Sequence, residues 1–220
     1  MKESTLKAVL ALSAIVMFAG LQNSVHAETL SIVHVNAPAV NCKFDPTCTV
    51  VVNDFVTDFA WSSSSNDSFL QSRTWPQGKP GTAAAGLYAY VYRIDLSKAM
   101  AATNYTCVTS FSIPFGPVAA VDYSGSGTTS HVFVITTGGL GTIAPVAAVK
   151  TGNKIDFTFQ QPFCNGGQPG KGGMTFFFGL ASKNPSRQVT SILSRDIGPA
   201  LSLKAVAPKI LPPKILPPKK

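Results

Sequence analysis

Length and composition already limit the class of protein. The chain has 220 residues, of which 45% are hydrophobic and only 13% charged, and this excludes an intrinsically disordered chain. Its 18 glycines and 16 prolines disfavour an all-helical bundle, because both residue types break helices. The formal net charge is +8, but much of it lies at the C-terminus, so the rest of the chain is close to neutral.

A targeting segment opens the chain. Lys2 and Lys7 precede an apolar run from 8 to 21, and a small-residue pattern follows. This order predicts a secretory signal peptide over 1–27. The run is shorter than the roughly 20 residues that a membrane-spanning helix needs, so an uncleaved membrane anchor is the weaker alternative. We expect a mature protein that begins at Glu28, is secreted, periplasmic or held in the cell envelope, and has no membrane span after cleavage.

The four cysteines fit an exported protein. In an oxidising compartment an even number of cysteines indicates disulfides, and four cysteines allow three pairings. We favour Cys42–Cys48, which closes a small loop, and Cys107–Cys164, which links two distant strands. A zinc site is disfavoured because the spacing contains no C-x-x-C pair with a nearby histidine. No metal and no cofactor is expected.

Alternating apolar and polar residues recur at short intervals along the body of the chain. Glycine, serine and asparagine clusters separate these stretches, as turns require. The pattern predicts an all-β, antiparallel β-sandwich of about 9–10 strands over 28–206, with only 96–102 helical. The expected strands are 29–35, 49–59, 87–94, 107–115, 118–123, 131–137, 155–160, 175–181, 188–193 and 200–206.

The segment 207–220 is a proline- and lysine-rich tail in which Pro-Lys-Ile-Leu-Pro occurs twice. This spacing of proline forbids a helix or a central strand, so we expect a disordered, extended tail. One interpretation is an inert solvated end. The other is a tether to an anionic envelope surface, or a ligand for a proline-binding groove. We expect no nucleic-acid partner.

Candidate chemical sites are few. The glycine-rich stretch 165–173 lacks the P-loop spacing, and the turn 122–127 lacks the carboxylates of a calcium loop. The mature chain contains one glutamate, Glu28, and neither a G-x-S-x-G nor an H-E-x-x-H motif. A hydrolase would need a cleft that brings His131 near a serine and an aspartate. We therefore expect a protein that is not an enzyme.

Aromatic residues are the main binding candidates. Tyr88, Tyr90 and Tyr92 share one face of a strand, and Trp61 and Trp75 flank a serine-rich polar segment. Sugar-binding proteins present flat aromatic rings beside polar groups, so these five residues are candidate ligands for a glycan if the tyrosine face is exposed. The alternative is that all five belong to the core, as aromatic residues in strands commonly do.

Three stretches carry a resemblance to known sequences: 86–96, 138–142 and 176–182. They resemble segments of uncharacterised bacterial exported proteins, and the similarity covers 28 to about 205 but not the tail. It implies a bacterial, exported protein and suggests no activity. Together with the motifs, it leads us to expect a non-enzymatic envelope or extracellular protein with a structural or binding role, with a carbohydrate-binding module as the alternative.

Overall fold

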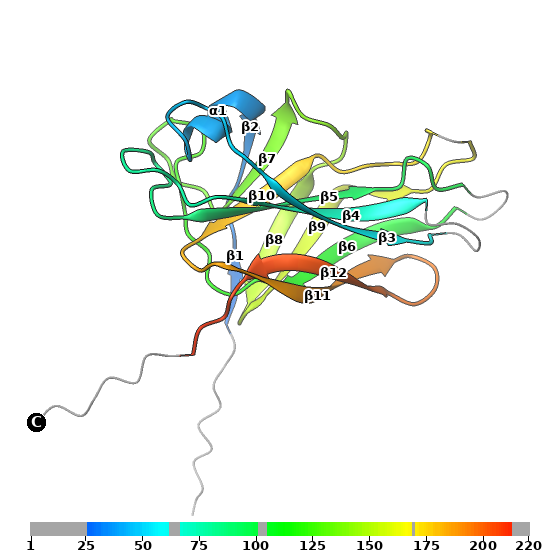
Figure 1. The fold of residues 1–220 in the computed structure, drawn as a ribbon. Helices are drawn as coiled ribbons and strands as arrows, with labels where there is room; N and C mark the ends of the chain where they lie inside the picture. Colours follow the sequence, from blue (N-terminus) through cyan, green and yellow to red (C-terminus); the bar gives the residue numbers. More distant parts are fainter. Residues whose placement is uncertain (1–25, 62–66, 101–104, 169, 213–220) are drawn as a thin grey trace, which may run out of the picture.

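The chain forms two six-stranded β-sheets packed face to face (Figure 1). The structure, a computed structural model, describes residues 26–61, 67–100, 105–168 and 170–212. Inward-facing apolar residues from both sheets form the layer between them. The predicted all-β sandwich is confirmed.

The first sheet has the strand order β1 (Ala27–Thr29), β8 (Pro145–Thr151), β9 (Lys154–Cys164), β6 (Cys107–Pro114), β11 (Ser186–Arg195) and β12 (Leu201–Pro208). The second sheet has the order β2 (Ile32–Asn36), β7 (Val132–Thr137), β10 (Phe177–Ser182), β5 (Tyr88–Asp95), β4 (Ser68–Trp75) and β3 (Asn53–Phe59). Segments far apart in the sequence are neighbours in both sheets.

One edge of the second sheet departs from the predicted antiparallel arrangement. Strands β2 and β7 pair in parallel, whereas every other strand pair in the described part of the chain is antiparallel. The expected single strand 29–35 is broken at Ser31, where the chain leaves the first sheet and joins the second. The backbone N–H of Val132 donates to Ser31 O at 2.9 Å, and Ser31 Oγ lies 2.9 Å from His131 Nδ1. These contacts fix the crossover point.

Several predicted elements were wrong in detail. Strands β4 and β8 were not predicted, and 118–123 forms only isolated bridges. The described part of 96–102 is a turn followed by a bridge at Met100, not a helix. The one helix among the described residues is α1 (Ala37–Cys42), which Asn36 caps through its side chain and which has a proline in its first turn. Strand β12 continues to Pro208, two residues into the predicted tail.

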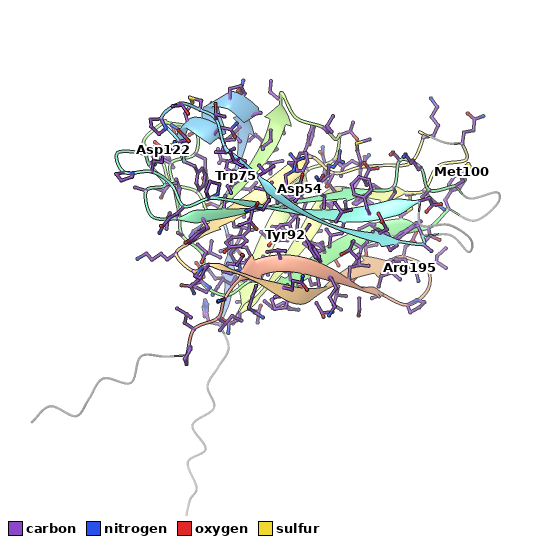
Figure 2. The ribbon with its side chains drawn as sticks, viewed as in Figure 1. Asp54, Trp75, Tyr92, Met100, Asp122 and Arg195 are labelled. Carbon is purple, nitrogen blue, oxygen red and sulfur yellow. A yellow bond between two sulfur atoms is a disulfide. The ribbon has the colours of Figure 1, made fainter. Side chains whose placement is uncertain are left out.

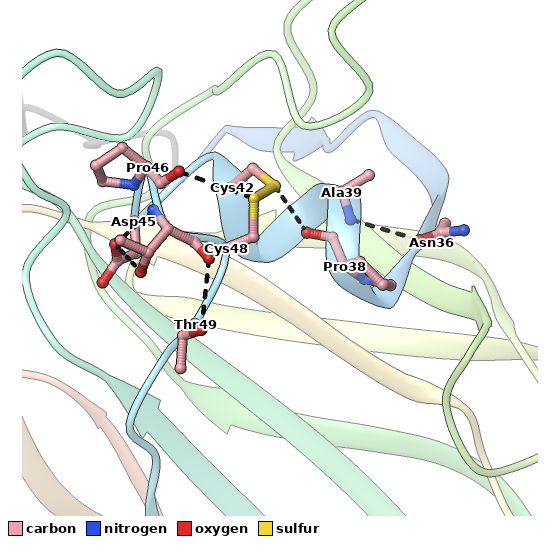
Figure 3. The surroundings of a disulfide bond; sticks show 9 residues. Asn36, Pro38, Ala39, Cys42, Asp45, Pro46, Cys48 and Thr49 are labelled. Carbon is pink, nitrogen blue, oxygen red and sulfur yellow. Dashed lines mark hydrogen bonds between the residues drawn. A yellow bond between two sulfur atoms is a disulfide. The ribbon is translucent and has the colours of Figure 1, made fainter.

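Both predicted disulfides are present. Cys107 and Cys164 lie directly opposite each other on β6 and β9. Cys42, at the end of α1, is joined to Cys48 in the loop that follows (Figure 3). Cys48 has a left-handed backbone with φ of 58°, a conformation that costs about 1 kcal/mol or more for a residue other than glycine.

A second apolar cluster covers the outer face of the second sheet. Helix α1 and the loops around 43–52, 76–87 and 116–131 lie over this face and pack on Val91 and Phe133. Both faces of β5 are covered, one by the core between the sheets and the other by this outer cluster. Strand β5 is therefore buried at every position after Tyr88. No helix within the described ranges is long and apolar enough to cross a membrane.

Candidate functional site: a pocket on the outer face of the second sheet

The predicted tyrosine face is buried, so its assignment as an exposed glycan-binding surface was wrong. Tyr90 and Tyr92 have no exposed surface, and Tyr88 is partly buried. Tyr92 points between the two sheets, where its hydroxyl donates to the carbonyl of Val206 at 2.8 Å (Figure 2). Burial raises the pKa of Tyr92 well above its ordinary value. The tyrosines lie on the inner face because they alternate with Ala89 and Val91, which belong to the cluster on the outer face.

The two tryptophans are also buried, and they lie on opposite faces of the second sheet. Trp61 belongs to the core between the sheets, where its Nε1 donates to Thr106 O at 2.9 Å. Trp75 belongs to the cluster on the outer face. The five predicted aromatic residues therefore do not form one site, and of the polar segment 62–67 the residues 62–66 lie outside the described residues.

The outer face of the second sheet carries a pocket of about 440 Å³. Its floor consists of alternate residues from four neighbouring strands: Trp75, Val91, Ile135 and Phe177. Helix α1, the segment 50–52 and the turn 138–140 form its walls. Small-molecule sites commonly have volumes of about 300–1,000 Å³ and a mostly apolar lining, so this pocket has the size and chemistry of a ligand site.

Arg73 is the charged residue in the pocket lining. Its Nε donates to Asp54 Oδ1 at 2.7 Å, and its Nη2 donates to Asp54 Oδ2 at 3.4 Å. The guanidinium lies over the ring of Phe177, with Cζ 4.5 Å from the ring centroid. Asp54 lies opposite Arg73 across the β3–β4 pair, so strand register brings the two together. The Arg73 guanidinium is therefore held at one edge by the Asp54 carboxylate and across its plane by the Phe177 ring.

A second arginine lies against the same ring. Arg93 Cζ is 5.1 Å from the Phe177 centroid, and its Nη2 is 3.6 Å from Asp95 Oδ2. Burial lowers the pKa of the Arg93 guanidinium, while the charge of Asp95 opposes that change. Two guanidinium groups therefore lie against the Phe177 ring, and each is paired with a carboxylate, so the formal charges cancel.

Three buried polar atoms on the outward-facing side chains of β4 and β5 lack a hydrogen-bond partner among the described residues: Gln71 Oε1, Arg93 Nε and Trp75 Nε1. All three residues point outward from β4 or β5, because Gln71 lies opposite Arg93 and Trp75 lies opposite Ala89. Leaving such atoms unsatisfied costs about 1–3 kcal/mol each, so each unpaired group in a folded protein calls for an explanation, such as a bound molecule that supplies the partner. Of the three residues, Trp75 lines the pocket.

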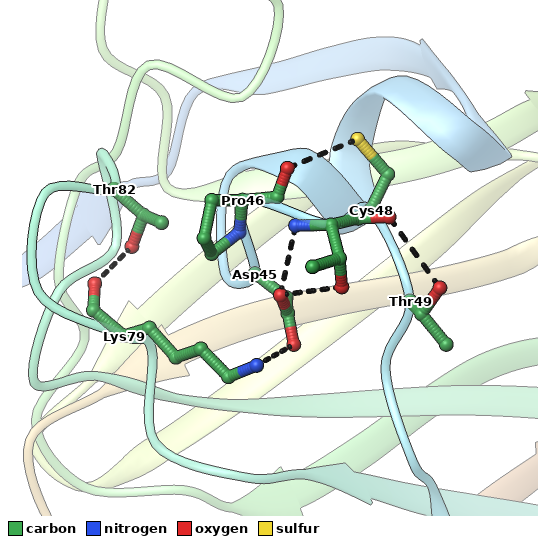
Figure 4. A network of polar contacts seen from close by, with 7 residues as sticks. Asp45, Pro46, Cys48, Thr49, Lys79 and Thr82 are labelled. Carbon is green, nitrogen blue, oxygen red and sulfur yellow. Dashed lines mark hydrogen bonds and ion pairs between the residues drawn. The ribbon is translucent and has the colours of Figure 1, made fainter.

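The wall beside the pocket is rigidly built. Asp45, inside the loop that the Cys42–Cys48 disulfide closes, accepts from the backbone N–H and hydroxyl of Thr47 and pairs with Lys79 Nζ at 2.6 Å (Figure 4). These contacts lower the pKa of Asp45 to about 2, and the hydrogen bond from Lys79 contributes most to the change. The Cys48 N–H donates to Asp45 O at 2.8 Å, which closes the turn. The segment that carries Val50 is thus held by a disulfide and an ion pair.

The calcium-loop candidate is a self-contained turn. The carboxylate of Asp122 accepts backbone N–H groups from Gly125, Ser126 and Gly127 at 2.7–3.1 Å. These hydrogen bonds lower the pKa of Asp122, the bond from Gly127 contributing most. Its oxygens already serve the turn, and within the described residues no group of three His, Cys, Asp or Glu side chains could hold a metal.

The hydrolase hypothesis required His131 to lie near a serine and an aspartate, and among the described residues the structure places only a serine beside it. His131 Nδ1 lies 2.9 Å from Ser31 Oγ and accepts the backbone N–H of Ser31 at 3.3 Å. No carboxylate in the described part of the chain hydrogen-bonds to His131, and the contact sits at the crossover between the sheets. Its observed role is structural. The described residues of 165–173 connect β9 to β10, with Gly166 N donating to Ala99 O at 2.9 Å.

Sequence reasoning missed the pocket. Its key residues lie in β4, where Phe69, Gln71, Arg73 and Trp75 alternate with inward-facing residues. That alternation was the available signal, but polar residues at two of the outward positions concealed it. Comparisons with protein-family models, with curated proteins and with solved structures each return no match to this chain.

Proposed function

We propose that this protein is a non-enzymatic, exported binding protein of the extracellular space or cell envelope, and that the pocket over Phe177 is its ligand site. The observation that carries the proposal is the pocket itself: an apolar floor of four strands beside a wall held by a disulfide and the Asp45–Lys79 ion pair. Preformed concave sites of this kind bind ligands without first paying to order their walls.

Export is supported by two kinds of observation. The signal-peptide pattern and the resemblance to bacterial exported proteins come from the sequence. Two disulfides, with no free cysteine among the described residues, are compatible with an oxidising compartment. Fractionation of the host, with mass spectrometry of the unreduced protein, tests this part. A mature N-terminus at Glu28 in the exported fraction is expected, and an uncleaved cytosolic chain with free thiols would overturn it.

The pocket is tested with a neutral apolar dye, N-phenyl-1-naphthylamine, whose emission rises in apolar surroundings. Val50 lines the pocket, and Val51 beside it is 76% exposed and does not. We expect Val50→Phe to fill the pocket and abolish dye binding, while Val51→Phe binds as the unmodified protein does. Equal binding by both variants, each with an unchanged melting temperature, would contradict the assignment.

The basic tail supports a second proposal, a tether to an anionic envelope surface. The start of the tail is fixed: Lys209 N donates to Pro185 O at 2.8 Å, and Asn184 Nδ2 donates to Lys209 O at 2.7 Å. Ile210 and Leu211 beyond it are 40% and 59% exposed. We expect deletion of 213–220 to reduce sedimentation with phosphatidylglycerol vesicles and leave dye binding unchanged. Unchanged sedimentation would remove the tether proposal and leave the pocket proposal intact.

A further inference from the structure

We infer that the ligand of this pocket is a small organic acid, with a flat apolar body on the Phe177 floor and a carboxylate on Arg73. The inference rests on the proposed binding function and goes further by naming the class of ligand. Arg73 is the charged side chain of an otherwise mostly apolar lining, so it determines which polar group an apolar ligand can carry into the site.

The hydrogen-bond geometry of Arg73 leaves the right donors free. A guanidinium has five N–H groups, and Asp54 accepts from the Nε and Nη2 side. The Nη1 donors, and the Nη2 donor beside them, have no partner among the described residues. This end of the guanidinium presents parallel N–H groups, and a carboxylate accepts such a pair with both oxygens.

Arg73 is also held in place before any ligand arrives. Asp54 fixes one edge of the guanidinium, and the Phe177 ring supports its plane at 4.5 Å. Its side chain is 32% exposed, so the free end remains accessible. An arginine that is already fixed loses little side-chain entropy on binding. This favours the binding of a carboxylate that accepts from both parallel N–H groups at the free end of the guanidinium.

The apolar floor selects the rest of the ligand. Val91, Ile135 and Phe177 present an apolar surface of side chains, and Leu140, which also lines the pocket, is 58% exposed. A volume of about 440 Å³ accommodates a molecule of two fused rings rather than a folded partner. Burial of such a ring system supplies most of the affinity, and the carboxylate supplies the preference.

Asp54 makes the inference testable with opposite signs. Its carboxylate shares Arg73 with the ligand and repels a second anion. Asp54→Asn should therefore strengthen binding of an acid, whereas Arg73→Gln should weaken it. A ligand that bound through its apolar body alone would respond to neither change.

The experiment is isothermal titration calorimetry of the full mature chain with three matched probes: 2-naphthoate, 2-naphthamide and 2-naphthylmethylammonium. We expect 2-naphthoate to bind about tenfold more tightly than the ammonium probe. Arg73→Gln should remove about tenfold of the naphthoate affinity and change naphthamide little, and Asp54→Asn should tighten naphthoate severalfold. Arg73→Lys, which keeps the charge and loses the fork, should bind naphthoate less tightly than the unmodified protein.

Arg195→Gln is the matched control. Arg195 donates to Pro199 O and lies over Trp61, so it is a partly buried arginine outside the pocket lining. It should leave all three affinities unchanged. Equal binding of the three probes, blocked by Val50→Phe, would overturn the acid preference and leave the binding function standing. Binding of none of them, together with no effect of Val50→Phe on the neutral dye, would overturn both.

Discussion

The two outer faces of this sandwich follow different rules. The outer face of the first sheet is open and carries small hydroxyl side chains: Ser110, Ser112, Thr158, Ser194 and Ser202. The outer face of the second sheet carries large apolar ones, including Phe133 and Phe177, and loops cover it. A strand with one wet face alternates in polarity, whereas a strand covered on both sides does not. The pocket lies where the cover of the second sheet is incomplete.

Covering a sheet with loops requires those loops to be held. Three local interactions hold the loops over the second sheet: the Cys42–Cys48 disulfide, the Asp45–Lys79 ion pair and the hydrogen-bonded turn at Asp122. The first sheet needs none of these on its outer face, and its own disulfide, Cys107–Cys164, links neighbouring strands directly. Comparison of matched changes on the two faces therefore tests whether one face is a second core.

The largest difference is expected from core truncation. Phe133 is fully buried on the outer face of the second sheet, with its ring centroid 4.8 Å from that of Tyr123. Phe133→Ala should destabilise the protein by up to about 5 kcal/mol in urea unfolding. Ile192 on the outer face of the first sheet is 37% exposed, and Ile192→Ala should cost about 1 kcal/mol. Equal losses would contradict the description of the covered face as a core.

Removing each disulfide sharpens the comparison. Cys107 and Cys164 are 57 residues apart in sequence, so replacing both by alanine should cost about 4 kcal/mol through unfolded-chain entropy. Cys42 and Cys48 are 6 apart, and their replacement should cost about 2 kcal/mol. Glycine instead of alanine at 48 should recover about 1 kcal/mol, because φ there is 58°. Melting of the four proteins measures this, and no advantage of glycine would show that the left-handed backbone is not retained.

Acid should loosen the cover of the second sheet before the rest. The pKa of Asp45 is lowered to about 2 in the folded protein from an ordinary value of 3.8. A lowered folded pKa means that the stabilisation is complete above about pH 4 and is lost as the pH falls through 2. Asp45→Asn should therefore be less stable than the unmodified protein at pH 6, and the gap should close by pH 2. Urea midpoints at pH 6, 4, 3 and 2 measure it, and a gap independent of pH would contradict the assigned role.

The smallest effects are expected on the open face. Thr158 and Ser202 are exposed there. Replacing either by alanine should change stability by no more than about 0.5 kcal/mol, because neither side chain packs in a core. A loss of several kcal/mol in the melting of either variant would mean that the open face is covered in solution by something else.

The sequence alone predicted much of the frame. Strict alternation in 87–94 and 155–160 revealed β5 and β9, and the even number of cysteines, with their spacing, led to both disulfides. It failed where a position depends on distant neighbours. Alternation shows that the tyrosines share a face, but only the assembled sheets show that this face is inward. Strand β4 escaped detection because buried Gln71 and half-buried Arg73 read as surface residues. Pairing of β2 with β7 is a non-local choice that leaves no local pattern.

The break at Ser31 has a consequence for how the chain folds. The strands on its two sides precede the rest of the sandwich in the chain, yet their partners β8 and β7 follow them by about 100 residues or more. By contrast, β3, β4 and β5 are consecutive in the sequence and adjacent in the sheet, so they can pair as soon as they are synthesised. Folding that proceeds from the N-terminus must therefore leave the earliest strands unpaired until residue 151 is available. The pairing of β1 with β8 and of β2 with β7 is then a late step between segments far apart in the sequence. Its rate should determine how long the unpaired edges of β1 and β2 stay exposed.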